Sequence, residues 1–354
     1  MKTEIVEVHP DFPDLKKIIY CAKIIRQGGL VIFPTETVYG IAADFSNPRA
    51  IQRLREVKGR SEDKPFSVLI SQRALISNYT TSTDPALYKL INAFWPGPLT
   101  VVVPSKEEGK TIGIRMPDHK IALRLVQESQ CTIAAPSANR TGEESPTTCQ
   151  EALKNLDGLV EVAIDGGIAR IGKGSSVVDL VQEKPTVLRE GTITQADVDR
   201  VTQKKGVLFI CTGNSCRSVM AEYFLKNLLK DRDDVEVLSA GTGVFLRSTA
   251  SAETVAVLKA EGIDASQHLS QPISTVLLKQ ADLIFVMTRG HRQQVLERIP
   301  EVEKRVYLLK EFIKTAGGYS FDLDIPDPIG RPREAYEECL AMIKEAVQRI
   351  AQLV

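Results

Sequence analysis

The sequence predicts an α/β protein of two domains, the first built on a twisted mixed sheet and the second on a four-stranded parallel sheet with helices on both faces. Apolar strand-like runs alternate with helical patterns along the whole chain, and proline-rich loops interrupt this rhythm mainly in the first half. The length of 354 residues accommodates two domains of ordinary size. No flexible Gly/Ser tract lies between them, so we expect adjacent domains at residues 1–203 and 204–354.

The first half begins with a helical pattern. Residues 15–27 place apolar side chains at helical spacing and stop at Gly28 and Gly29, as is typical of a helix C-terminus. Proline-rich turns such as WPGP at residues 95–98 favour a mixed sheet over a regular doubly wound one. Apolar runs that indicate strands lie at residues 29–33, 66–70, 99–103, 131–135 and 176–181.

The second half is more regular. Its alternation of strands and helices predicts a parallel sheet covered on both faces, which is a Rossmann-like arrangement. The expected strands are residues 207–210, 235–239, 282–287 and 305–308. The expected helices are residues 217–230, 250–261, 289–298 and 333–352.

The composition is that of a globular protein, with 43% hydrophobic and 25% charged residues. No apolar run approaches the roughly 18 residues of a membrane span, and the first residues form no continuous signal-peptide core. Six cysteines are scattered in a way that fits neither a disulfide framework nor paired zinc ligands, so we expect a cytoplasmic protein without a metal site. Basic and acidic residues number 45 each, so any contact with nucleic acid needs a local patch.

The stretch CTGNSCRS, residues 211–218, joins an apolar strand to an amphipathic helix. Cys211 follows the strand and Arg217 opens the helix, a placement that stabilises a nucleophilic thiolate. The N–H groups of the loop and the planar guanidinium would hold an oxyanion, and Gly213 would allow the tight turn. Asp327, between two prolines, could supply a proton to a leaving group. A cysteine after a strand can also be plain core, and the absence of a second ligand pair disfavours a metal.

With these residues, positions 207–354 resemble the low-molecular-weight protein tyrosine phosphatase family. The resemblance implies that Cys211 forms a phosphocysteine, that Arg217 binds the phosphate and that Asp327 acts as general acid and then as base. It implies a phosphorylated protein as substrate and no cofactor for the phosphatase. The resemblance also assigns supporting roles in the loop, to Asn214 and Ser218 for its order and to Cys216 for a protective disulfide with the nucleophile.

The substrate of this phosphatase depends on residues that depart from the tyrosine-specific pattern. Tyrosine-specific members follow the acid with two aromatic residues, whereas this chain has Ile329 and Gly330. Members that act on phosphoarginine carry a small hydroxyl residue where this chain has Ser215. We interpret the domain as a protein-arginine phosphatase, with phosphotyrosine as the alternative. An arsenate reductase is disfavoured because only Cys339 remains as a resolving cysteine, and the intact catalytic residues argue against a degenerate binding domain.

Polar loops follow the strands of the first half, which has neither a P-loop nor a dinucleotide fingerprint. One cluster of cations, in KGRSEDKP, would by itself fit a solvated helix end. If the loops converge, the same cations would suit a triphosphate. The loops are PTETVYG at 34–40, KGRSEDKP at 58–65, GIRMP at 113–117, APSAN at 135–139, GKGSSVVD at 172–179 and LREG at 188–191.

In this order the loops resemble the YrdC-like threonylcarbamoyl-AMP synthases over roughly residues 10–200. The resemblance implies that L-threonine, bicarbonate and ATP react to threonylcarbamoyl-AMP and pyrophosphate, with Mg²⁺ arriving with the nucleotide. The product would serve a downstream transferase complex that modifies tRNA. The residues expected to face ATP are Lys58, Arg60, Lys64, Ser137, Asn139, Ser145 and Arg189. Those expected to face threonine are Thr37, Arg115, Ala135 and Ser175. The alternative is a tRNA or double-stranded RNA binding module without synthase activity.

Overall fold

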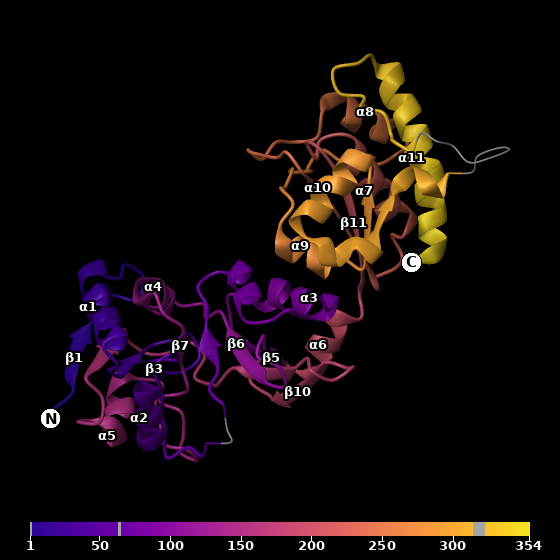
Figure 1. Ribbon diagram of the computed structural model, residues 1–354. Helices are drawn as coiled ribbons and strands as arrows, with labels where there is room; N and C mark the ends of the chain where they lie inside the picture. The colour runs from indigo at the N-terminus through magenta and orange to yellow at the C-terminus, as the bar shows by residue number, and fades with distance from the viewer. Residues whose placement is uncertain (1, 63–64, 314–322) are drawn as a thin grey trace. The chain divides into compact units, whose positions relative to one another are not determined.

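The computed structural model describes residues 2–62, 65–313 and 323–354, so Lys64 lies outside the described residues. The chain divides into two compact units, an N-terminal unit of Met1–Ser82 with Lys89–Val201 and a C-terminal unit of Thr83–Tyr88 with Thr202–Val354 (Figure 1). Both units are α/β, as the sequence predicts. None of the helices in the described ranges is both long and apolar enough to span a bilayer.

A mixed sheet forms the centre of the N-terminal unit, which confirms the predicted class. Its strand order over the described residues is β1-β8-β2-β3-β7-β4-β6-β5-β9-β10. The sheet contains parallel pairs such as β1 with β8 and antiparallel pairs such as β2 with β3 and β5 with β6. The strands are β1 (Glu4–Glu7), β2 (Val31–Phe33), β3 (Gly40–Asp44), β4 (Val68–Leu69), β5 (Leu99–Pro104), β6 (Thr111–Arg115), β7 (Ile133–Ala134), β8 (Val162–Asp165), β9 (Ser176–Asp179) and β10 (Thr186–Arg189).

Helices cover both faces of this sheet. Apolar side chains of α1 and α4 pack with Val31 and Phe33 on one face, and those of α2 and α5 pack with Ile32 and Ile41 on the other. The first helix begins where Asp14 caps the N–H of Lys16 and ends before Gly28, whose φ of 87° suits glycine. The helices are α1 (Leu15–Arg26), α2 (Pro48–Lys58), α3 (Pro85–Phe94), α4 (Lys120–Ser129), α5 (Cys149–Leu156) and α6 (Gln195–Thr202), with a 3₁₀ turn η1 (Arg73–Asn78).

The C-terminal unit has the predicted parallel sheet, in the order β12-β11-β13-β14. Its strands are β11 (Lys205–Cys211), β12 (Val235–Gly241), β13 (Leu283–Val286) and β14 (Val306–Leu308). Its helices are α7 (Arg217–Leu228), α8 (Ala252–Ala260), α9 (Thr275–Gln280), α10 (Arg289–Arg298) and α11 (Arg333–Leu353), with 3₁₀ turns η2 (Pro300–Arg305) and η3 (Leu309–Phe312).

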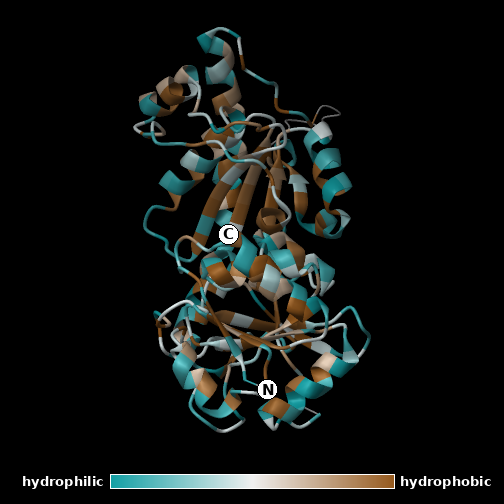
Figure 2. Cartoon of the chain, turned by 90° about the vertical axis from the view of Figure 1, so that its left-hand side faces the viewer, coloured by the Kyte–Doolittle hydropathy of each residue, from teal (hydrophilic) through white to brown (hydrophobic). Residues whose placement is uncertain are grey.

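Both faces of the parallel sheet are apolar and covered. Side chains of α7, α8 and α11 pack with Phe209 and Phe285, and those of α9 and α10 pack with Ile210 and Ile284. Figure 2 shows the strands of this unit as a brown, hydrophobic layer between helices that carry teal, hydrophilic segments. Strand β11 is central, and the loop to α7 starts at its carboxyl end, which is where open parallel sheets place ligands.

Candidate active sites

The loop between β11 and α7 surrounds the sulfur of Cys211, which is 3% exposed. The backbone N–H of Asn214 donates to Cys211 Sγ at 3.2 Å, and Ser218 Oγ lies 3.0 Å from the same sulfur. An N–H and a hydroxyl therefore contact one thiol, and the 12-residue helix α7 begins beside it. Such donors stabilise a thiolate, which is the form that attacks phosphorus.

Asn214 fixes the shape of this loop. Its φ of 50° is left-handed, so the turn relies on Asn214 and not on a positive φ at Gly213. Its Nδ2 donates to Ser218 Oγ at 3.0 Å and to Ser239 Oγ at 2.7 Å, while its Oδ1 accepts from the N–H of Gln271 at 2.9 Å. Both N–H groups and the oxygen of the side-chain amide thus hold the loop against β12 and the segment that follows α8.

A buried chain of polar groups continues from Asn214 away from the sulfur. Ser239 Oγ donates to Glu222 Oε2 at 2.5 Å, and Lys226 Nζ donates to the other oxygen of Glu222 at 2.5 Å. His268 Nε2 lies 2.9 Å from the carbonyl oxygen of Asn214. Glu222 follows the loop on α7, whereas Ser239 and His268 are distant in sequence and are brought to the loop by the fold.

Arg217 and Asp327, the predicted phosphate-binding residue and general acid, are brought together. Arg217 Nη2 forms an ion pair with Asp327 Oδ2, and Arg217 Nη1 donates to the carbonyl oxygen of Ile325 at 3.1 Å. The Arg217 side chain is buried, whereas the Asp327 side chain is 41% exposed. Any anion that binds this guanidinium must therefore compete with the Asp327 carboxylate.

His291 supports the same loop from α10. Its Nε2 lies 2.9 Å from Thr212 Oγ1 and its Nδ1 lies 2.9 Å from Thr288 Oγ1. Burial and the nearby charge of Arg217 lower the pKa of His291 to about 4. The imidazole is therefore neutral at pH 7, with a hydroxyl beside each ring nitrogen.

The residues on which the predicted substrate preference rests lie around the loop. Cys216 is a free thiol whose Sγ donates to Ser251 Oγ at 3.4 Å, and Ser215 Oγ lies 3.6 Å from that sulfur. Ile329, which follows the acid, is 56% exposed. The loop that carries Asp327 therefore presents an aliphatic side chain at the position where the tyrosine-specific pattern has an aromatic one.

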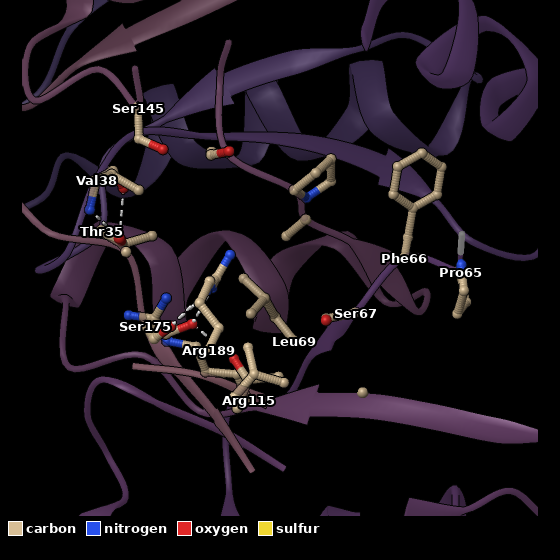
Figure 3. Close-up of a pocket in the computed structure, with 18 of the residues that line it drawn as sticks. Thr35, Val38, Pro65, Phe66, Ser67, Leu69, Arg115, Ser145, Ser175 and Arg189 are labelled. Carbon is tan, nitrogen blue, oxygen red and sulfur yellow. Dashed lines mark hydrogen bonds between the residues drawn. The ribbon is translucent and has the colours of Figure 1, made fainter. Parts of the chain in front are cut away.

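The N-terminal unit contains a cavity of about 360 Å³ whose lining residues come from β2, β3, β4, β5, β6, β9 and β10 and from the loops between them. Figure 3 shows Thr35, Ser145, Ser175, Arg115 and Arg189 around a common space, with Phe66 across from Thr35. Thr35 and Thr100 line the cavity although no motif role was assigned to them. The predicted residues that line it are Arg60, Arg115, Ala135, Ser137, Ser145, Ser175 and Arg189.

Arg189 is fixed against one wall. Its Nε and Nη2 donate to the carbonyl oxygen of Ser175 at 3.0 and 2.8 Å, and Ser175 Oγ lies 2.9 Å from Thr100 Oγ1. Burial, then the charges of Arg115 and Arg60, lower the pKa of Arg189, although a guanidinium stays charged at neutral pH. The shared field of three arginines makes this cavity a site for anions.

Arg115 is held by a second buried set. Its Nη2 donates to Glu36 Oε1 at 2.6 Å and to Thr37 Oγ1 at 2.9 Å, and its Nε donates to the carbonyl oxygen of Gly97 at 3.2 Å. Thr37, predicted to face threonine, is fully buried behind Arg115 and is not among the cavity-lining residues. Glu36 is 1% exposed and was not singled out from the sequence.

Lys58, predicted to face ATP, points into the protein. Its Nζ donates to the carbonyl oxygens of Ser137 and Asn139 at 2.7 and 2.6 Å and to Asn139 Oδ1 at 3.1 Å. Burial, with a smaller effect of the Arg60 charge, lowers the pKa of Lys58 to about 8. Neither Lys58 nor Asn139 lines the cavity; together they hold the loop that presents Ser137 to it. Within the described ranges, no cluster of three or more His, Cys, Asp or Glu side chains could hold a metal ion.

The fold and the two sites define a pair of α/β enzyme domains, one with an arginine-lined cavity and one with a cysteine-centred phosphate loop. The family described as "Telomere recombination", which groups Sua5, YciO and YrdC, matches residues 23–191. The family described as "Low molecular weight phosphotyrosine protein phosphatase" matches residues 206–354. The chain belongs to the threonylcarbamoyl-AMP synthase family in its N-terminal half and carries a low-molecular-weight phosphatase domain in its C-terminal part.

Individual relatives support this assignment. The threonylcarbamoyl-AMP synthase of Bacillus subtilis is 38% identical over 194 residues, covering 52% of this chain and 56% of that protein, so this chain spans little more than half of its length. The putative threonylcarbamoyl-AMP synthase of Mycobacterium tuberculosis is 35% identical over 198 residues, covering 54% of this chain and 89% of that protein. A solved structure of P. abyssi Sua5 is 27% identical with a TM-score of 0.53, covering 74% of this chain and 89% of that one.

Proposed function

We propose that the chain is a bifunctional enzyme whose residues 1–203 synthesise threonylcarbamoyl-AMP and whose residues 204–354 hydrolyse phosphoprotein. The observation that carries the first activity is that Arg60, Arg115 and Arg189 line one and the same cavity, together with hydroxyl side chains. Three guanidinium groups match a substrate set that contains a triphosphate and two carboxylates. L-threonine, bicarbonate and ATP, with Mg²⁺ bound to the nucleotide, form such a set.

The synthesis needs no covalent enzyme intermediate. The threonine amine loses a proton and attacks the carbon of CO₂ to give a carbamate; with bicarbonate, the C–OH bond breaks in the same step and water leaves. A carbamate oxygen then attacks the α-phosphorus of ATP, the bond to the β-phosphate bridge breaks, and pyrophosphate leaves. Arg115 orients the amino-acid carboxylate, while Arg60 and Arg189 neutralise the phosphates, so positioning and charge compensation dominate. The product is an activated intermediate for the modification of tRNA.

Pyrophosphate release that depends on threonine tests the synthase. We expect the full-length chain to release pyrophosphate from ATP only with L-threonine and bicarbonate, and Arg60→Ala to abolish this release while leaving phosphatase activity intact. Cys211→Ser serves as the matched control, because it removes the phosphatase nucleophile from the other unit. RNA binding without any threonine-dependent release would favour the alternative of an RNA-binding module.

The C-terminal unit supports a cysteine-dependent phosphatase. Cys211 attacks phosphorus, Arg217 binds the equatorial oxygens, and Asp327 protonates the leaving group and later activates the water that hydrolyses the phosphocysteine. We favour phosphoarginine as the substrate because Ser215 supplies a small hydroxyl beside the loop and Ile329 replaces an aromatic wall. Phosphotyrosine is the second candidate.

Matched phosphoarginine and phosphotyrosine peptides distinguish the two substrates. The parent chain should prefer phosphoarginine, and Ser215→Ile should reduce that preference by removing the hydroxyl. Cys211→Ser gives the background rate for both peptides. Equal turnover of the two peptides by the parent and by Ser215→Ile would remove the support for phosphoarginine.

A further inference from the structure

Glu36 stands out among the buried charges of the N-terminal unit. It is 1% exposed, and only its Oε1 is paired, with Arg115 Nη2 at 2.6 Å. Its Oε2 is buried and has no hydrogen-bond partner among the described residues. Burying a carboxylate is unfavourable unless its oxygens are satisfied. A residue that served packing alone could be replaced by an apolar side chain, so this carboxylate calls for a functional account.

The backbone around Glu36 holds the carboxylate in one place. Glu36 lies on the connection between β2 and β3, and its carbonyl oxygen accepts from the N–H of Ile171 at 2.8 Å. The carbonyl oxygen of Thr37 accepts from the N–H of Gly172 at 3.0 Å. The loop is therefore tied to the segment that leads into Ser175, another residue of the cavity wall.

The three bonds on Arg115 leave one end of its guanidinium available. Nη2 and Nε are used by Glu36, Thr37 and Gly97, whereas Nη1 makes no hydrogen bond within the described part of the chain. Arg115 itself lines the cavity, and Figure 3 shows it beside Ser175 and Arg189. The geometry thus presents one N–H edge of Arg115 to a ligand and withholds the other.

Because of Glu36, the arginines of the cavity differ in how far their charge is neutralised by the protein. Glu36 directly neutralises Arg115, whereas Arg189 is fixed by the neutral oxygens of Ser175. A polyphosphate therefore binds more strongly near Arg189 than near Arg115, and a singly charged carboxylate suffices for Arg115.

We infer that Glu36 is a positioning residue that fixes Arg115 for the carboxylate of the amino-acid substrate and directs the polyphosphate towards Arg189. This inference rests on the proposed synthase function. Glu36 touches no reacting atom in this account and acts only through Arg115.

Steady-state kinetics and L-threonine binding on the full-length chain test the inference. Glu36→Gln keeps the volume and an acceptor oxygen but removes the charge. We expect it to raise the KM for L-threonine at least about 10-fold, to leave the KM for ATP within about 2-fold, and to strengthen inhibition by inorganic pyrophosphate. Glu36→Asp keeps the charge and should recover part of the threonine affinity. Glu161→Gln, in the partly exposed pair with Arg53, is the matched control and should change none of these values.

A double-mutant cycle separates positioning from a general structural effect. In an Arg115→Ala background, Glu36→Gln should add no further loss of threonine binding, because the residue through which it acts is gone. Additive losses, or an equal rise of both KM values, would overturn the inference, as would unchanged threonine binding by Glu36→Gln. Retained ATP affinity in Glu36→Gln or Glu36→Asp shows that the variant is folded.

The same experiment distinguishes this inference from the proposed function. If the parent chain binds L-threonine but releases no pyrophosphate, the synthase proposal fails, and the binding cycle still decides the role of Glu36. If the parent chain neither binds threonine nor uses it, both fail. If the parent chain is an active synthase and Glu36→Gln behaves like it, only the role of Glu36 is overturned.

Discussion

Replacing Asn214 by alanine and by glycine tests how the phosphate loop is held. Alanine removes the three side-chain hydrogen bonds to Ser218, Ser239 and Gln271, which amounts to about 3 kcal/mol. The left-handed conformation costs an alanine about 1.5 kcal/mol more, whereas glycine adopts it without strain but costs about 0.7 kcal/mol through its freer unfolded state. The free energy of unfolding should therefore fall by about 4.5 kcal/mol in the alanine variant. In the glycine variant it should fall by about 1 kcal/mol less.

Hydrogen exchange of the intact chain measures these differences locally. Amides of β11 and β12 should exchange about 10³-fold faster in Asn214→Ala than in the parent chain. In Asn214→Gly the same amides should exchange about 5-fold more slowly than in Asn214→Ala. Amides of β5 and β6 in the other unit serve as the control and should not change. Phosphatase kcat/KM should fall in both variants. An alanine variant as stable as the glycine variant, or unchanged exchange in β11, would refute the argument from the left-handed backbone.

Three further predictions concern buried charges and the catalytic acid. Lys58→Met removes three hydrogen bonds, which costs about 5 kcal/mol, but it also removes a buried charge, which returns about 3 kcal/mol. The free energy of unfolding should therefore fall by about 2 kcal/mol, as measured by urea unfolding followed by Trp95 fluorescence. An unchanged midpoint would contradict this. Because the pKa of His291 is about 4 in the fold and about 6.5 in the unfolded chain, the unfolded chain takes up the proton first as the pH falls. The C-terminal unit should therefore lose up to about 3 kcal/mol between pH 6.5 and pH 4, and hydrogen exchange should show no such loss in His291→Gln. Asp327→Asn should lower phosphatase kcat by about 10²-fold or more, and the loss should be larger for substrates with poor leaving groups. An equal loss for all leaving groups would argue against an acid role.

The C-terminal unit could be predicted closely because its strands are continuous apolar runs. Buried parallel strands show such runs, and amphipathic helices between them give an unambiguous alternation. The predicted strand at 282–287 is β13 (Leu283–Val286), and the predicted helix at 289–298 is α10 (Arg289–Arg298). Helix α9 escaped prediction because it has only six residues and thus less than two turns of pattern.

The N-terminal sheet was predictable in class but not strand by strand. Strand β3 has the sequence GIAAD, and its glycine and alanines show little β preference, so its strand conformation comes from pairing with β2 and β7. Strand β10 is largely exposed and shows no continuous apolar run. Tertiary pairing decides such segments, and a single sequence does not contain that information.

The sites show the same division between local and distant information. The loop 211–218 could be predicted because its residues are neighbours in sequence. Glu36 and Arg115 are 79 residues apart, and His268 and Asn214 are 54 apart, so no local pattern joins them. The resemblance indicated which loops line the cavity, but not that Lys58 supports a loop from behind.

The crowding of Arg60, Arg115 and Arg189 has a consequence for the response of the protein to salt. Solvent anions reduce the mutual repulsion of these guanidinium groups, so simple salts should stabilise the N-terminal unit. The same anions must leave before a nucleotide enters, so rising ionic strength should weaken the apparent affinity for ATP. Salt would then act on this half of the chain in two opposite directions, protecting the fold while competing with the substrate.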